Sequence, residues 1–195
     1  MAEHLEIEQK FEVGADFTRP DFGGVADGVT VADPVIHHLS ATYYDTTDTR
    51  LAAARITLRR RTGGTDAGWH LKLPGGGADA RREVHAPLSD ELPDSLAARV
   101  AEVTGGAPVV PVASIVTERT VIALTVRDQA VAEVADDLVT ARRLEPEGDP
   151  RHWREVEVEV PERNPALQEA VADRLRSAGA RPASRASKLA RALEG

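Results

Sequence analysis

The sequence predicts an α+β fold that is mainly β, in which an eight-stranded antiparallel sheet curls into a closed barrel with peripheral helices. Charged and aliphatic residues alternate in LEIEQKF near the start and in WREVEVEV near the end. Such alternation places one kind of side chain on each face of a strand. The strand-like segments mostly follow one another, and the helical segments are inserted between them or appended. A closed barrel of about eight strands can hold one small ligand.

Eight segments have the alternation or the composition of β-strands. They are residues 5–13, 38–46, 55–61, 69–74, 81–88, 109–126, 130–145 and 151–160. Gly63 and Gly64 would begin a hairpin connection between the third and fourth segments. The segment 109–126 fits either one long strand or two short ones, and it would pair with the next segment as a meander.

Four further segments indicate helices or turns. They are residues 49–54, which fit a short helix or a turn, and the helical segments 89–104, 165–176 and 184–195. Ser89 or Asp90 can act as N-cap of the helix that Gly105 would end. Pro165 opens the next helix, and Gly179 stops it.

Composition excludes several classes of protein. At 195 residues, the chain is most simply one domain spanning residues 1–195, and a net charge of −8 argues against a general nucleic-acid binder. Without cysteine there are no disulfides and no thiolate metal site. No apolar segment approaches the length that spans a bilayer, and the N-terminus is unlike a signal peptide. We therefore expect a cytoplasmic protein that binds neither membranes nor nucleic acid.

Charged side chains share faces on the expected strands. The groups are Glu6, Glu8 and Lys10; Thr57, Arg59 and Arg61; His70 and Lys72; Arg81, Glu83 and His85; Thr117 and Arg119; Glu133 and Asp137; and Glu155, Glu157 and Glu159. Clustered Arg and Lys suit a polyanion, because they match phosphate oxygens. Clustered carboxylates suit Mg²⁺ or Mn²⁺. Each strand alone is more simply a solvated face, but together they provide what phosphoryl transfer requires.

These residues resemble a known family. Glu6-x-Glu8-x-Lys10 is similar to the ExExK signature of CYTH domains, the triphosphate tunnel metalloenzymes, which include inorganic triphosphatases, thiamine triphosphatases and class IV adenylate cyclases. The other motifs that resemble the family follow in its order: Arg59 and Arg61 after TYYDTTDTRL, Lys72 in WHLKLP, Arg81 and Glu83, Arg119, Asp137, the ExE strand and Ser187-Lys188. All three lysines of the chain, Lys10, Lys72 and Lys188, lie at motif positions.

The resemblance implies an eight-stranded closed tunnel that binds a triphosphate and usually hydrolyses it with Mg²⁺ or Mn²⁺. The metal ligands that it implies are Glu6, Glu8, Asp137, Glu155, Glu157 and Glu159. The phosphate-binding residues are Lys10, Arg59, Arg61, Lys72, Arg81, Arg119 and Lys188. The catalytic positions are Lys10, Glu8 and Glu157. Asp137 is preferred to Asp136 because it shares a face with Glu133, and either Tyr43 or Tyr44 could partner Lys10.

The resemblance leaves several functions open. We expect hydrolysis of inorganic triphosphate to pyrophosphate and phosphate. The alternatives are a non-catalytic module that binds polyphosphate or a nucleoside triphosphate, a thiamine triphosphatase, a class IV adenylate cyclase, and a structural β domain with solvated charges. The ending SKLARALEG resembles the junction between a CYTH domain and a helical, polyphosphate-associated CHAD domain. The protein could stand alone or belong to a longer chain, as a monomer or a homodimer.

Overall fold

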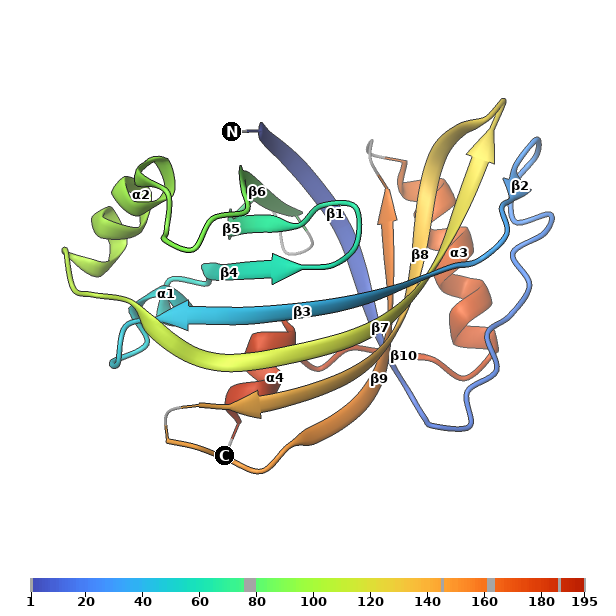
Figure 1. Cartoon of the computed structure of the whole chain (residues 1–195). Helices are drawn as coiled ribbons and strands as arrows, with labels where there is room; N and C mark the ends of the chain where they lie inside the picture. The colour runs from blue at the N-terminus through green and yellow to red at the C-terminus, as the bar shows by residue number, and fades with distance from the viewer. Residues whose placement is uncertain (1, 76–79, 145, 161–163, 186, 195) are drawn as a thin grey trace.

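The computed structural model describes residues 2–75, 80–144, 146–160, 164–185 and 187–194, with only the backbone described for residues 2–6 and 80. The elements are β1 (Ala2–Val13), β2 (Thr30–Val31), β3 (Val35–Asp45), α1 (Arg50–Ala53), β4 (Thr57–Thr62), β5 (Gly68–Pro74), β6 (Ala80–Pro87), α2 (Asp94–Thr104), β7 (Val110–Val126), β8 (Gln129–Arg143), β9 (Arg151–Val160), α3 (Pro165–Ser177), β10 (Arg181–Pro182) and α4 (Lys188–Leu193). Figure 1 shows the long strands wrapping around a common interior.

Eight long antiparallel strands follow one another in the order β1-β6-β5-β4-β3-β7-β8-β9, and β1 also pairs with β9. Residues Ala2 to Ile7 of β1 pair with β6, and residues Ile7 to Val13 pair with β9. The two ends of the sheet therefore meet along β1, which confirms the predicted antiparallel barrel. The barrel is less closed than expected, because each half of β1 pairs with only one of these two neighbours.

The register at this seam brings charged residues together. Glu8 lies opposite Glu159, and Lys10 lies opposite Glu157. On the next pair of strands, Glu133 of β8 lies opposite the same Glu159. Because directly opposed residues project to the same face of a sheet, three strands present one row of charged side chains.

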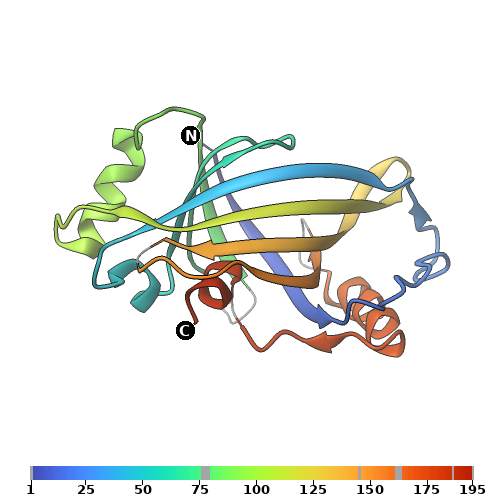
Figure 2. The same cartoon turned by 60° about the horizontal axis from the view of Figure 1, so that its bottom comes forward.

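Two helices cover parts of the outer surface of the barrel. Val171 and Leu175 of α3 belong to an apolar cluster with Val156 and Val158 of β9. Helix α2 packs through Leu96 and its neighbours over the side chains that point outward from β4 and β5. In Figures 1 and 2 these helices lie at opposite ends of the molecule. Burying an aliphatic side chain stabilises a fold by roughly 1.5–3 kcal/mol. Both helices therefore stabilise the barrel by packing against the outer surface of its strands.

The last helix, α4, lines the interior. Its Leu189 and Ala192 pack with Tyr43 and Ile115, which point inward from β3 and β7. The side chain of Ser187 caps the helix by accepting a hydrogen bond from the backbone N–H of Ala190 at 3.1 Å. The helix therefore carries its first residue, Lys188, into the barrel.

Most expected elements are confirmed, but two helices begin later than expected. Helix α4 begins at Lys188, not at residue 184. Helix α2 begins at Asp94, not near residue 89, although Gly105 ends it as expected in the left-handed conformation. The backbone carbonyl of Ser89 instead accepts hydrogen bonds from Trp69 and Arg60, which holds the preceding segment as a loop. The alternatives left open are settled: residues 110–126 form one strand, and a short helix forms at residues 50–53. No helix in the described part of the chain is long and apolar enough to cross a membrane.

Candidate functional site

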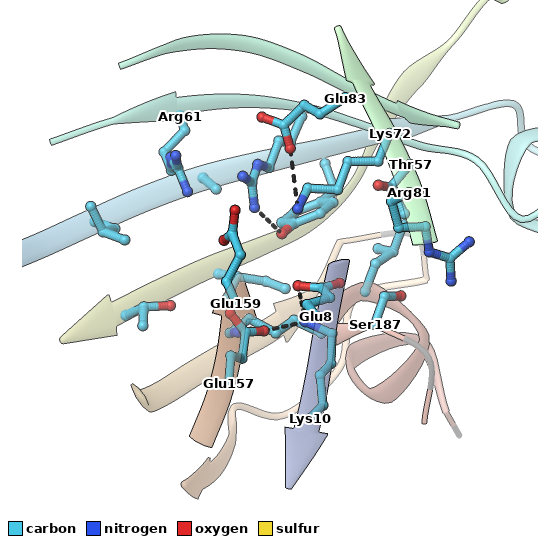
Figure 3. A pocket seen from close by; sticks show the side chains of 18 of the residues that line it. Glu8, Lys10, Thr57, Arg61, Lys72, Arg81, Glu83, Glu157, Glu159 and Ser187 are labelled. Atoms are coloured by element: carbon cyan, nitrogen blue, oxygen red, sulfur yellow. Dashed lines mark hydrogen bonds and ion pairs between the residues drawn. The ribbon is translucent and has the colours of Figure 1, made fainter. Parts of the chain in front are cut away.

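A cavity of about 480 Å³ lies inside the barrel. Charged side chains from seven strands, from α4 and from the connections beside β4 line it: Glu8, Lys10, Arg55, Arg59, Arg61, Asp66, Lys72, Arg81, Glu83, Arg119, Glu133, Glu157, Glu159 and Lys188. Figure 3 shows them as two groups that face each other, with Arg61, Lys72 and Glu83 in one group and Glu8, Lys10 and Glu157 in the other.

The first group, which we name the paired cluster, consists of Lys10, Arg119 and Lys188 with Glu8, Asp137, Glu155 and Glu157. Lys10 Nζ lies 3.1 Å from Glu8 Oε2 and also forms an ion pair with Glu157. Arg119 donates two hydrogen bonds to Asp137, at 2.8 and 2.6 Å, and one to Glu157 at 2.7 Å. A guanidinium and a carboxylate joined in this bidentate way hold each other in one orientation.

Lys188 lies at the centre of the paired cluster. Its Nζ is 2.8 Å from Asp137, 2.6 Å from Glu155 and 2.8 Å from Glu157. Trp153 donates a further hydrogen bond to Glu155 at 2.6 Å. One ammonium thus contacts three buried carboxylates that come from two neighbouring strands.

These contacts shift the pKa values of the paired cluster in opposite directions. Burial alone would raise the pKa of Glu157, but Lys10, Lys188 and Arg119 hold it well below its ordinary value. The pKa of Asp137 is lowered in the same way, because Lys188 and Arg119 outweigh its burial. Burial would lower the pKa of Lys188, but the carboxylates raise it well above its ordinary value. Glu157, Asp137 and Lys188 are therefore charged at neutral pH.

The carboxylates of the paired cluster could hold a metal ion. One ligand atom from each of Asp137, Glu155 and Glu157 lies within 4.8 Å of the others. Carboxylate oxygens are the donors that Mg²⁺ and Mn²⁺ prefer. In the described arrangement the Lys188 ammonium contacts all three, whereas Glu8 and Glu159 line the cavity and add oxygen donors there.

The second group, which we name the cationic cluster, consists of Arg59, Arg61, Lys72 and Arg81. Arg59 donates a hydrogen bond to the hydroxyl of Tyr43 at 3.4 Å, and Arg81 donates one to the backbone carbonyl of Arg55 at 3.3 Å. Burial, followed by Arg59 and Arg119, lowers the pKa of Arg61 to about 9. Arg61 also forms an ion pair with Asp66, which lines the same cavity. The four cations of the cluster outnumber the two neighbouring carboxylates, Glu83 and Asp66, so an anion would be attracted to it.

A buried pair of side chains supports the cationic cluster. Glu83 Oε2 lies 3.1 Å from Lys72 Nζ, and Glu83 Oε1 lies 2.5 Å from Nδ1 of His70. Both Glu83 and His70 are buried. The other ring nitrogen of His70, Nε2, lies 2.9 Å from the backbone carbonyl oxygen of Asp66. Glu83 therefore positions Lys72 by an ion pair, and its own orientation is fixed by its contact with His70.

The structure brings most of the expected site residues together. The expected residues that line the cavity are Glu8, Lys10, Arg59, Arg61, Lys72, Arg81, Arg119, Glu157, Glu159 and Lys188. Asp137 and Glu155 are buried and contact Lys188. The side chain of Glu6 lies outside the described residues.

Geometry also separates the alternatives that the sequence left open. Asp136 bonds Arg154, at 2.9 and 2.8 Å, rather than any member of the paired cluster. Tyr43 lines the cavity, whereas the ring of Tyr44 packs 5.1 Å from that of Trp69. The choice of Asp137 therefore agrees with the described contacts, and Tyr43 is the tyrosine that reaches the interior.

Sequence reasoning left two supporting residues without a role. His70 and Glu83 were placed on the faces of Lys72 and Arg81, but alternation could not show that they contact each other. The signal that could have found them is the antiparallel register of two adjacent strands, which sets Lys72 opposite Glu83.

The chain matches a protein-family model and two curated relatives over nearly its whole length. The model of the CYTH domain matches residues 4–193. MT2285 of Mycobacterium tuberculosis strain CDC 1551 / Oshkosh and Rv2226 of strain ATCC 25618 / H37Rv, both described as uncharacterized, are each 42% identical to the chain over 209 residues. These matches cover 98% of the chain, which spans 40% of the length of either relative.

Solved structures share the fold at low sequence identity. A candidate adenylate cyclase from Bacillus halodurans superposes with a TM-score of 0.68 and 17% identity, over 100% of both chains. A candidate adenylyl cyclase from Hippeastrum, with a dominant triphosphatase activity, has a TM-score of 0.50 and 14% identity, and the match covers 96% of this chain and 94% of that one. At such identities the likeness concerns the fold alone.

Proposed function

Because the chain belongs to the CYTH domain family, we propose that it hydrolyses a triphosphate in its charged cavity with Mg²⁺ or Mn²⁺. The preferred substrate is inorganic triphosphate, which yields pyrophosphate and phosphate. One observation carries the proposal: a single cavity is lined both by the cationic cluster and by carboxylates of the paired cluster. Phosphoryl transfer depends mainly on such positioning and charge stabilisation.

The cationic cluster would bind the phosphate oxygens. Arg59, Arg61, Lys72 and Arg81 reach the cavity from three adjacent strands, so they could contact successive phosphates of an extended anion. Arg119, Lys10 and Lys188 would complete the set from the opposite wall. The Arg fork can bind two phosphate oxygens at once, whereas Lys supplies a compact charge.

The carboxylates would hold the metal and orient water. Glu8, Glu157 and Glu159 line the cavity, with Asp137 and Glu155 adjoining, and Glu6 stays a predicted ligand. A bound Mg²⁺ or Mn²⁺ would neutralise charge on the phosphates. Glu8 or Glu157 would accept a hydrogen bond from the attacking water and so orient it. The bond from the water oxygen to phosphorus would form as the P–O bond to the leaving pyrophosphate breaks, and the proton would be released to solvent. Lys10, which contacts both carboxylates, would keep them in place.

The character of the cavity favours inorganic triphosphate over a nucleotide. Among the described residues, Tyr43 is the one aromatic side chain that lines the cavity, and its hydroxyl is bonded to Arg59. A nucleobase or a thiamine ring usually gains affinity by stacking on aromatic side chains. The remaining apolar lining is aliphatic and includes Ile56, Ile115 and Leu189.

Phosphate release from a substrate panel tests the proposal. The purified chain would be incubated with tripolyphosphate, ATP, thiamine triphosphate or long-chain polyphosphate, each with Mg²⁺ or Mn²⁺. We expect the fastest release from tripolyphosphate. Release from none of the four substrates would contradict hydrolysis, and tight polyphosphate binding without turnover would favour the binding module. Cyclic AMP formed from ATP would identify a cyclase instead.

A further inference from the structure

His70 and Glu83 form a buried pair. Glu83 is among the residues that line the cavity, and His70 is not. His70 is 1% exposed and Glu83 is 3% exposed. Each nitrogen of the imidazole ring meets an oxygen: Nδ1 lies 2.5 Å from Glu83 Oε1, and Nε2 lies 2.9 Å from the Asp66 carbonyl oxygen. Both distances are those of hydrogen bonds, so both contacts require a proton between nitrogen and oxygen.

The two contacts cannot both be satisfied by a neutral ring beside a carboxylate. A neutral imidazole carries one N–H, and a backbone carbonyl or a carboxylate can only accept. If the N–H points to Glu83, the lone pair on Nε2 faces the carbonyl of Asp66, and the reverse holds for the other tautomer. One additional proton satisfies both, either on the ring or on the carboxyl group of Glu83.

The surroundings oppose that additional proton while the cavity is empty. The charged and titratable groups around His70 in the described part of the chain are Arg59 and Arg61 on β4, Asp66 in the connection to β5, Lys72 on β5, and Glu83 and His85 on β6. Burial, together with Arg59 and Arg61, lowers the pKa of His70 to about 4 against the opposing influence of Glu83. The ring is therefore neutral at pH 7.

We propose that binding of a triphosphate to the cationic cluster drives uptake of a proton by the His70–Glu83 pair. The anion would neutralise Arg59, Arg61 and Lys72, and so remove the repulsion that opposes a positive charge at His70. The pre-formed contacts of both ring nitrogens would then hold the proton, which comes from the solvent and joins the ring nitrogen that lacks one. No other bond forms or breaks. His70 acts here as a positioning residue, through Glu83 and Lys72.

This inference rests on the proposed function only in requiring a triphosphate at the cationic cluster. A coupled proton makes affinity depend on pH with a definite sign. If about one proton is taken up, affinity for the anion weakens by up to about tenfold per pH unit as pH rises above the pKa of His70 in the free protein. The proton would also raise the positive charge beside Lys72 when a polyanion is bound.

Calorimetric titration with tripolyphosphate, in EDTA-containing buffers of different ionisation enthalpy, measures the proton directly. The wild-type chain would be compared with H70Q, which keeps polar groups but cannot be protonated, and with H85Q as the matched control, because the His85 ring lies 4.8 Å from that of His70. Protons bound or released by the anion itself cancel in this comparison. We expect the wild-type chain and H85Q to take up about one more proton than H70Q.

Equal proton uptake by the wild-type chain and H70Q would overturn the inference but leave triphosphate binding intact. No binding by the wild-type chain would overturn both the inference and the proposed function. NMR of the His70 ring in the wild-type chain gives a second test that does not depend on the folding of a variant. When tripolyphosphate is added at pH 7, we expect one additional proton on the pair. Either the His70 ring becomes doubly protonated, or the carboxyl group of Glu83 is protonated and donates to the ring. A neutral ring beside an ionised Glu83 in the complex would contradict the inference.

Discussion

The paired cluster and the cationic cluster are both built from charge-alternating strands, but their charges are balanced differently. In the paired cluster, Lys188 alone contacts three carboxylates, and Arg119 contacts two. In the cationic cluster, Lys72 pairs with Glu83 and Arg61 with Asp66, whereas Arg59 bonds a tyrosine hydroxyl and Arg81 a backbone carbonyl. Every charged member of the first cluster has an oppositely charged partner within the cluster, whereas in the second the cations outnumber the neighbouring carboxylates.

Because of this difference, we expect the paired cluster to contribute to the stability of the fold and the cationic cluster to contribute to anion binding. Removing one partner from a buried ion pair leaves an uncompensated charge and is strongly destabilising. Removing a cation from a set that repels itself relieves repulsion and weakens only the attraction to an anion. We therefore expect substitutions in the paired cluster to affect stability and activity together. Those in the cationic cluster should affect binding with little effect on stability.

The largest effect is expected from E157Q. Glu157 contacts Lys10, Arg119 and Lys188, so its loss leaves three cations less neutralised. We expect the free energy of unfolding to fall by about 3 kcal/mol and kcat for tripolyphosphate to fall by roughly 10²–10⁴-fold. Denaturant melts and phosphate release measure the two effects. The control is E147Q at the exposed Arg142–Glu147 pair, which should change neither. Wild-type stability in E157Q would contradict the balance described for the paired cluster.

Next in size is R59Q, compared with R60Q. Arg59 lines the cavity, whereas the adjacent Arg60 bonds the Ser89 carbonyl and Asp90. Loss of a charge-assisted hydrogen bond worth about 1.5–3 kcal/mol should raise KM for tripolyphosphate by roughly 10–100-fold in R59Q. R60Q should keep the wild-type KM. Thermal melts of R59Q should match the wild type, and a large loss of stability would show that its charge is needed for folding.

A third expectation concerns the ligand itself. An anion that binds the folded chain but not the unfolded chain stabilises the fold by about 2.7 kcal/mol at a concentration of 100 Kd. For a chain of this size, such a stabilisation raises Tm by roughly 5–10 °C. Differential scanning fluorimetry with tripolyphosphate and Mg²⁺ measures the shift. R59Q should show a smaller shift than R60Q at the same concentration. An unchanged Tm for the wild-type chain would exclude the cavity as the binding site.

Much of this comparison could be predicted from alternation, and the remainder depends on register. The expected members of both clusters that lie on strands were identified because their side chains recur every second residue opposite aliphatic faces. Lys188 was identified only through the family resemblance. Alternation assigns a face but not a partner, so it could not show that Lys188 lies between Asp137 and Glu155. The start of α2 was missed because the Ser89 carbonyl bonds two side chains far away in sequence.

The acid stability of the chain should report on the paired cluster. The pKa values of Glu157 and Asp137 are lowered in the folded chain. Their stabilisation is therefore present above the pKa of the unfolded carboxyl groups and is lost as pH falls through the folded values. We expect the free energy of unfolding to decline below about pH 4, and less steeply in E157Q. Chemical denaturation between pH 2 and pH 7 measures this, and identical slopes would contradict the assignment.

The smallest effect is expected from Y43F. Tyr43 reaches the cavity, but its hydroxyl accepts a long hydrogen bond of 3.4 Å from Arg59. Losing a hydrogen bond worth about 0.5–1.5 kcal/mol should change kcat/KM by roughly two- to tenfold. Steady-state kinetics measures it, with Y44F as the control on the other face. A loss in Y43F as large as that in E157Q would give the hydroxyl a direct role in catalysis.

The measurement that tests the central claim most directly is a ³¹P NMR time course of tripolyphosphate with the wild-type chain and Mg²⁺. It reports binding and cleavage of the same molecule. We expect the tripolyphosphate resonances to be replaced by those of pyrophosphate and phosphate in equal amounts, and E157Q to leave tripolyphosphate largely uncleaved over the same period. Resonances of tripolyphosphate that neither shift nor decay with the wild-type chain would contradict a cavity that binds and hydrolyses a triphosphate.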